Sequence, residues 1–174
     1  MSIIVADASP LIALATIDQL ELLHKLYQNV LIPDAVAQEL MPDSNMAGAK
    51  RLKQAMDQGW LKTESCDYTL EPYLESYQQL LQIIDQGETE AILLAECLQA
   101  NSDYRFLLID ERRGRQVAKK RGLVIVGTGA VLLAAKKKGY ILSVKKELDK
   151  MQDKGYRLSM LLRRKLLELA GEAY

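Results

Sequence analysis

The stretch IIVADASP at residues 3–10 joins a short apolar run to an aspartate. Residues 3–6 have the length and β-branched content of a buried strand. Asp7 follows the end of that strand, Ser9 comes two residues later, and Pro10 helps to end the strand. Ligands of open parallel sheets bind beyond the carboxyl ends of the strands. The stretch therefore predicts a buried strand that carries a carboxylate into a site, provided that other carboxylates reach the same edge.

The rest of the chain repeats such apolar runs and separates them with helical patterns. Runs at 30–32, 106–109 and 123–126 predict further strands, and 60–62 predicts a weaker one. Strands that are apolar on both faces belong to a parallel sheet with helices on both sides. Helices are expected at 19–27, 33–40, 46–58, 72–84, 88–100, 112–120 and 130–138. Asp18 is expected to cap the first of them. The fold class is therefore α/β, a three-layer α/β/α sandwich around a central parallel sheet.

The C-terminal part, residues 143–174, changes to charged helical sequence. Ser159 has the residue type and the place of an N-cap for its last helix. We expect one domain over residues 1–142, with residues 143–174 as a helical extension that packs on the domain or on a partner, such as a second copy in a homodimer. Apolar residues at i, i+4 and i+7 form the packing stripe of the last helix: Leu162, Leu166 and Leu169.

The composition is that of a globular protein and argues against several classes. The 23 basic and 23 acidic residues of the 174-residue chain cancel, so the protein does not coat nucleic acid through bulk charge. No apolar run approaches the roughly 20 residues that cross a bilayer, and the start shows no signal-like pattern. Cys66 and Cys97 make no disulfide framework. We therefore expect a cytoplasmic protein without a membrane segment.

The chain has a single histidine, His24, which limits the catalytic mechanisms that use histidine as a base. Ser-His-Asp and Cys-His schemes would all depend on this one residue. It lies in the amphipathic pattern LELLHKLYQ at residues 20–28, where a histidine on the helix surface is the simplest explanation. Carboxylates are therefore the expected catalytic groups.

Glu90 is a carboxylate on the apolar side of a predicted helix. At 100° per residue it lies about 200° from Glu88, between Leu94 and Cys97. A buried carboxylate is costly unless a cation or a hydrogen-bond donor meets it. Glu88 falls on the polar side of the same projection, so we expect it to point away from Glu90 and rank it below Glu90 as a site residue.

Two further carboxylates complete a candidate acidic pocket. Asp110 ends the run RFLLID at residues 105–110 as Asp7 ends the first strand, and Glu39 lies at the edge of the buried side of its helix. Taken singly, a strand-end aspartate is often a turn residue or a helix cap, and Glu39 is compatible with a surface position. Taken together, Asp7, Glu39, Glu90 and Asp110 favour one pocket. Clustered carboxylates repel each other and call for protons or a divalent cation, and oxygen ligands suit Mg²⁺ or Mn²⁺.

Five sequence blocks resemble the PIN domain ribonucleases, in particular the PIN-like proteins related to VapC-type toxins. The blocks are IVADASPLIAL (4–14), VLIPDAVAQEL (30–40), GETEAILLA (87–95), LLIDERRGRQVAKKRGL (107–123) and VGTGAVLLAAKKKG (126–139). The resemblance covers roughly residues 1–140 and rests on the order of all five blocks. It implies a three-layer α/β/α fold and Mg²⁺- or Mn²⁺-dependent cleavage of RNA.

The resemblance also implies roles for single residues. Asp7, Glu39, Glu90 and Asp110 match the catalytic carboxylates of the family, and metal binding falls to Asp7, Glu90 and Asp110. Ser9 matches the small hydroxyl residue that helps to order the site. Many members carry D-x-D-F after the fourth strand, whereas Asp110 is followed here by Glu111 and two arginines. Candidate contacts to substrate phosphates are Arg112, Arg113 and Arg115, which a solvated helix face explains as well.

The expected function is therefore metal-assisted hydrolysis of RNA, with a toxin of a toxin–antitoxin pair as one role and an antitoxin protein as the matching partner. The alternative is a catalytically weak PIN-like module that binds RNA or protein. The sequence lacks the motifs of two other enzyme classes. A phosphatase with Asp7 as nucleophile would need a second aspartate at D-x-D spacing, and Gly127-Thr128-Gly129 is an incomplete dinucleotide fingerprint.

Overall fold

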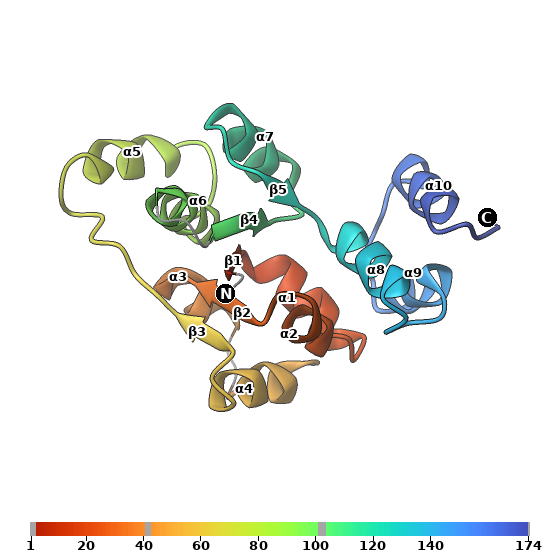
Figure 1. The fold of residues 1–174 in the computed structure, drawn as a ribbon. Helices are drawn as coiled ribbons and strands as arrows, with labels where there is room; N and C mark the ends of the chain where they lie inside the picture. The colour runs from red at the N-terminus through yellow and green to blue at the C-terminus, as the bar shows by residue number, and fades with distance from the viewer. Residues whose placement is uncertain (1–2, 41–42, 101–103, 174) are drawn as a thin grey trace.

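The computed structural model describes residues 3–40, 43–100 and 104–173, and five parallel strands form its central sheet. Their order across the sheet is β3-β2-β1-β4-β5 (Figure 1). This confirms the α/β class and the parallel sheet, including the weak strand at its edge. The strands are β1 Ile3–Ala6, β2 Asn29–Ile32, β3 Leu61–Thr63, β4 Tyr104–Leu108 and β5 Ile125–Val126.

Helices cover both faces of the sheet (Figure 1). Side chains of α5, α6 and α7 belong to the core on one face, and side chains of α1, α2, α3, α4, α8, α9 and α10 belong to the core on the other. Within the described residues the helices are α1 Ala8–Thr16, α2 Glu21–Tyr27, α3 Asp34–Leu40, α4 Ala49–Asp57, α5 Tyr73–Leu80, α6 Gln86–Gln99, α7 Arg112–Lys120, α8 Thr128–Lys137, α9 Val144–Asp153 and α10 Met160–Leu169. None of the helices described in these segments is long and apolar enough to span a membrane.

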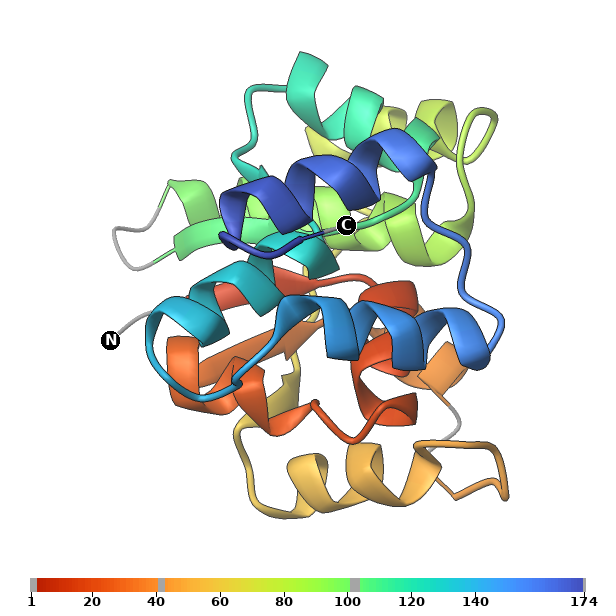
Figure 2. The same cartoon turned by 90° about the vertical axis from the view of Figure 1, so that its right-hand side faces the viewer.

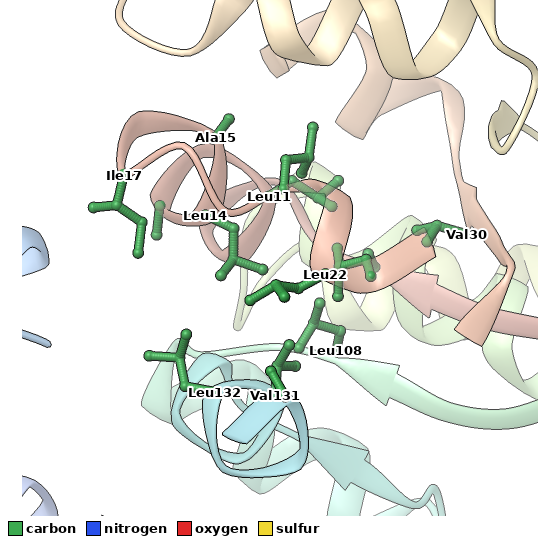
Figure 3. Close-up of a cluster of buried hydrophobic side chains, with 14 of the residues drawn as sticks. Leu11, Leu14, Ala15, Ile17, Leu22, Val30, Leu108, Val131 and Leu132 are labelled. Carbon is green, nitrogen blue, oxygen red and sulfur yellow. The ribbon is translucent and has the colours of Figure 1, made fainter. Parts of the chain in front are cut away.

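The strands are apolar on both sides because each face has its own core. On β1, Ile4 belongs to the larger core and its neighbour Val5 to the smaller one, as the two-residue period of a strand requires. In the larger core, side chains of α1 such as Leu14 point toward Leu132 of α8, with Leu108 of β4 beside them (Figure 3). Burial on both faces explains why the strands read as continuous apolar runs.

The strand order reverses beside β1, which lies between β2 and β4. β2 and β3 extend the sheet on one side and β4 and β5 on the other, so a crevice is expected at the carboxyl ends of β1 and β4. The backbone N–H of Asp7 donates to the carbonyl of Leu108 at 2.9 Å and joins the two strand ends. The fold thereby brings together the chain after β1 and the chain after β4.

Two local expectations about the first helices are wrong. Pro10 does not end the strand and no helix was expected before residue 19, whereas β1 ends at Ala6 and the chain enters α1 at Ala8, with Pro10 in its first turn, where a proline costs no hydrogen bond. Asp18 does not cap α2, which starts at Glu21. Asp18 has a positive φ of 63° and pairs with Arg51 instead. Sequence spacing identified the later helices but missed α1 and misplaced the start of α2.

The segment from residue 143 onward packs against the rest of the chain. Val144, Leu148 and Leu166 belong to the same core as β1, and α10 lies against α8 and α9 (Figure 2). Ser159 caps α10 as expected, accepting from the amide of Leu162 at 3.2 Å. The predicted stripe is wrong in part, because α10 buries Leu166 and Leu167, whereas Leu162 is 44% and Leu169 is 65% exposed.

Glu172 fastens the C-terminal end to the start of α9. Its carboxylate accepts from the amides of Val144 and Lys145 at 2.7 and 2.9 Å, and from Ser143 Oγ and Lys136 Nζ at 2.7 Å each. Burial raises the pKa of this carboxyl, but the hydrogen bonds from Lys136, Lys145, Ser143 and Val144 outweigh it and hold the pKa at about 2. The ionised carboxylate is therefore bound more tightly in the folded state than in the unfolded one.

Glu172→Gln is expected to lower the free energy of unfolding at pH 7 by roughly 1 to 3 kcal/mol, the range for hydrogen bonds to a charged group. The folded pKa lies below the ordinary 4.5, so this stability is complete above pH 4.5 and disappears as the pH falls toward 2. Urea unfolding at several pH values measures it, with Glu168→Gln at an exposed position of α10 as the control. A difference between wild type and variant that does not change with pH would contradict this account.

Candidate active site

Asp7 lies buried at the carboxyl end of β1. It is the N-cap residue of α1 and only 3% exposed. Burial is the main cause that raises its pKa from 3.8 to about 7, a hydrogen bond from the Ala8 amide opposes this, and the charges of Glu88, Asp85 and Glu39 raise it further. The strand-end aspartate therefore faces three carboxylates that come from α3 and from the start of α6.

Glu88 lies in the first turn of α6 and is 4% exposed. It forms a capping box with Asp85: its amide donates to Asp85 Oδ1 at 2.8 Å, and its Oε2 accepts from the Asp85 amide at 3.4 Å. Its Oε1 is buried without a hydrogen-bond partner. Burial, followed by the charges of Asp85, Glu111 and Glu39, raises the pKa of Glu88 to about 7, although the Asp85 amide lowers it. Glu88 thus has one unsatisfied carboxylate oxygen, and its charge acts on Asp7.

The expectation that Glu88 points to the outside is wrong. A helical projection assumes that one side of a helix meets water, but α6 packs against α3, α5, α7, β1 and β4, and its residues from Gly87 to Ala95 are all buried. Gly114 of α7 makes room for this carboxylate, since a Cβ there would lie 2.5 Å from Glu88 Oε1. A sequence signal was present, because Asp85 and Glu88 have capping-box spacing and so mark the start of the helix.

Glu39 reaches the same place from the end of α3. Its side chain lies over the start of α6, where a Cβ on Gly87 would collide with its Oε1. The residue is exposed, yet partial burial and then the charges of Asp85 and Glu90 raise its pKa. The structure therefore places Glu39 among the carboxylates, as the sequence pattern predicted.

Glu90 is buried as predicted but is held by donors from the protein. Its Oε2 accepts from the Ala35 amide at 3.0 Å, and its Oε1 accepts from Gln86 Nε2 at 2.8 Å and Tyr77 Oη at 3.3 Å. Both oxygens have partners, and Glu90 is not among the charges that raise the pKa of Asp7. The geometry thus gives Glu90 a structural position that ties α3 and α5 to α6.

Asp110 follows β4 and binds the start of α8. Its Oδ1 accepts from the Thr128 amide at 2.8 Å and its Oδ2 from Thr128 Oγ1 at 2.5 Å. It lines a groove together with Ser9, so the two strand ends do meet there. Asp110 is exposed and lies at the rim of the carboxylate cluster rather than among the groups that perturb Asp7.

The three candidate arginines of α7 do not form one site. Arg115 lies toward Asp110, donating from Nη1 to the carbonyl of Ile109 at 2.7 Å. Arg113 instead lines a separate hollow between α5 and α7, with Lys120 and Arg121. Arg112 is exposed. Of the three, Arg115 is the one that lies at the strand ends.

The residues present fit a hard divalent cation in kind. Asp7, Glu39 and Glu88 offer only oxygen atoms, and the unpartnered Oε1 of Glu88 leaves one buried acceptor without a donor or cation. In residues 3–40, 43–100 and 104–173 no three Asp, Glu, His or Cys side chains stand close enough to form a complete cage. Mg²⁺ needs no such cage, because it keeps several waters and binds through one or two carboxylates.

The family follows from a comparison with known proteins. A family model described as PIN domain matches residues 3–172, nearly the whole chain and including the C-terminal helices. Neither the curated proteins nor the solved structures gave a match. The parallel sheet with helices on both faces agrees with the family model. This protein therefore belongs to the PIN domain family and has a fold of the nuclease type.

Proposed function

We propose that this protein is a metal-dependent endoribonuclease whose centre consists of Asp7, Glu39 and Glu88, with Asp110 at the rim. One observation carries the proposal: Asp7 and Glu88 come from different elements, are both buried, and have pKa values raised to about 7. A fold gains nothing in stability from two buried carboxyls that repel each other. Such groups are typical of functional sites, where a bound cation or a substrate compensates for them.

The side chains of this centre have different roles. Asp7 and Glu88 would hold Mg²⁺ or Mn²⁺, with Glu39 closing the site from α3. A cation bound there would activate water and offset charge on the scissile phosphate. Ser9 is exposed beside Asp110, and no histidine serves it as a base, because His24 stacks on Trp60. Ser9 therefore supports the site rather than acting as a nucleophile.

RNA cleavage is expected to require added Mg²⁺ or Mn²⁺ and to stop with EDTA, because the carboxylates cannot neutralise the phosphate themselves. Zn²⁺ should restore little activity, since the cluster has no nitrogen or sulfur ligand. Gel analysis of an end-labelled single-stranded RNA measures both effects. Cleavage that persists in EDTA would contradict the proposal.

The biological role extends the same proposal. The resemblance to VapC-type proteins supports a toxin of a toxin–antitoxin pair, acting in the cytoplasm on RNA and restrained by an antitoxin protein. A homodimer would fit the exposed apolar side chains of α10 outside the groove at the strand ends, which are Met160, Leu161 and Leu169. Growth arrest on expression in a bacterial host, relieved by Asp7→Asn, tests the toxin role.

A second candidate is a PIN-like module that binds RNA or protein without cleavage. It is favoured by the engagement of Asp110 with Thr128, because this removes one expected carboxylate from the cluster. Purified protein that binds RNA in the presence of Mg²⁺ and never cleaves it would establish this alternative.

A further inference from the structure

A groove runs from the strand ends to the C-terminal helices. We call it the C-terminal groove, and it encloses about 590 Å³. One wall holds Ser9, Asp110 and Arg115, and the floor is the first turn of α8. The other wall is residues 156–159 and the start of α10, so segments far along the chain complete a space that begins at Ser9 and Asp110. Figure 2 shows α8, α9 and α10 together on the side of the molecule that carries this groove.

The lining combines apolar, aromatic, hydroxyl and guanidinium groups with the carboxylates of Asp110 and Glu111. The α10 wall is apolar, with Leu158 and Leu162, the opposite wall carries the hydroxyl of Ser9, and the guanidinium groups of Arg115 and Arg157 lie at the groove. Tyr156 adds a half-buried aromatic ring. Arg157 is exposed and has no salt bridge in the part of the chain that is described. Apolar surface, an aromatic ring and arginines together match a nucleotide, which has a flat base and a phosphate.

The place of the groove favours a nucleic acid over a protein segment. Its lining includes Ser9, two residues after Asp7, and Glu111, whose charge acts on Glu88, so a chain bound in the groove lies next to the carboxylate cluster. The cluster itself repels phosphate, and arginines in the groove offset this repulsion by pairing with phosphate oxygens. The volume lies within the range of about 300 to 1,000 Å³ of sites that enclose small ligands.

We propose that the C-terminal groove binds one or two unpaired nucleotides of a single-stranded RNA next to the carboxylate cluster. Arg157 and Arg115 contact phosphates, and Tyr156 and Leu162 contact a base. A single strand is required, because its bases can leave the stack and lie on aromatic or apolar side chains. The inference rests on the proposed ribonuclease function and assigns residues 156–162 the role of substrate binding.

The test measures binding of a labelled single-stranded RNA by fluorescence anisotropy in EDTA, so that no cleavage occurs. Arg157→Glu and Ala130→Glu both place a negative charge in the groove at exposed positions. Each is expected to weaken binding about tenfold, and Arg157→Glu should reduce the salt dependence by about one counterion. Arg164→Glu, at an exposed position of α10 away from the groove, is the matched control and should change affinity less than about twofold.

The outcomes separate this inference from the proposed function. The groove assignment would be overturned if both groove variants bound RNA with wild-type affinity, or if the Arg164 control lost as much affinity as they do. Mg²⁺-dependent cleavage by the wild type would in that case still support the ribonuclease. Loss of binding in both groove variants, with no cleavage by the wild type at any metal concentration, would support the groove and overturn the ribonuclease. Thermal melting of each variant verifies that the fold is intact, and preferred binding of double-stranded RNA would also overturn the inference.

Discussion

Asp7→Asn is expected to abolish RNA cleavage and at the same time to raise the melting temperature of the metal-free protein above pH 7. The loss of cleavage should be roughly 10²-fold or more, the scale for removing a group that acts on transition-state charge. The gain in stability follows from the raised pKa. A carboxyl whose pKa moves from 3.8 to about 7 costs the folded state up to about 4 kcal/mol once ionised.

The sign of this effect can be checked over pH. Because the folded pKa of Asp7 lies above its unfolded value, its contribution to stability is complete below pH 3.8 and is lost as the pH rises through 7. Melting curves in EDTA from pH 5 to 8.5 should therefore separate wild type from Asp7→Asn, and Mg²⁺ should stabilise only the wild type. Asp57→Asn, at an exposed position at the end of α4, serves as the control. A variant that loses both activity and stability would show that Asp7 is structural.

Glu88→Gln and Glu90→Gln are expected to have opposite effects, although the two residues are separated by one position. Glu88→Gln should abolish cleavage to a similar extent as Asp7→Asn, because it removes a carboxylate with an unpartnered oxygen beside Asp7. Glu90→Gln should retain the cleavage rate per folded molecule. It should lose about 1 to 3 kcal/mol of unfolding free energy, since a neutral amide replaces the charged acceptor of three donors.

Single-turnover cleavage and urea unfolding of both variants distinguish the two roles. Tyr77→Phe is a milder companion to Glu90→Gln, because it removes only the donor that lies at 3.3 Å. If Glu90→Gln lost cleavage while remaining stable, and Glu88→Gln remained active, the assignment of the site would have to return to Glu90.

The sequence alone identified much of this protein through short-range patterns. The strand ending at Asp7, the other four strands and the helices after residue 18 were readable from apolar runs and their boundaries, because local sequence controls backbone propensity and burial, but α1 was missed. Whether Asp7 and Asp110 share one edge of the sheet depended on their strands being neighbours, which the sequence left open and the strand order decides. The approach of Glu39 was visible in the sequence, from its place beside the buried side of α3.

The tertiary structure decided which buried carboxylate faces Asp7. The helical projection of α6 assumed one solvent-exposed side and one buried side. In the structure α3, α5, α7 and the sheet surround the start of this helix, so both Glu88 and Glu90 are buried. Glu90 has hydrogen-bond donors because Ala35 and Tyr77 lie against it. Glu88 keeps an oxygen without a donor because that oxygen packs against Gly114 of α7. These contacts join residues up to 55 positions apart, and no local pattern encodes such neighbours.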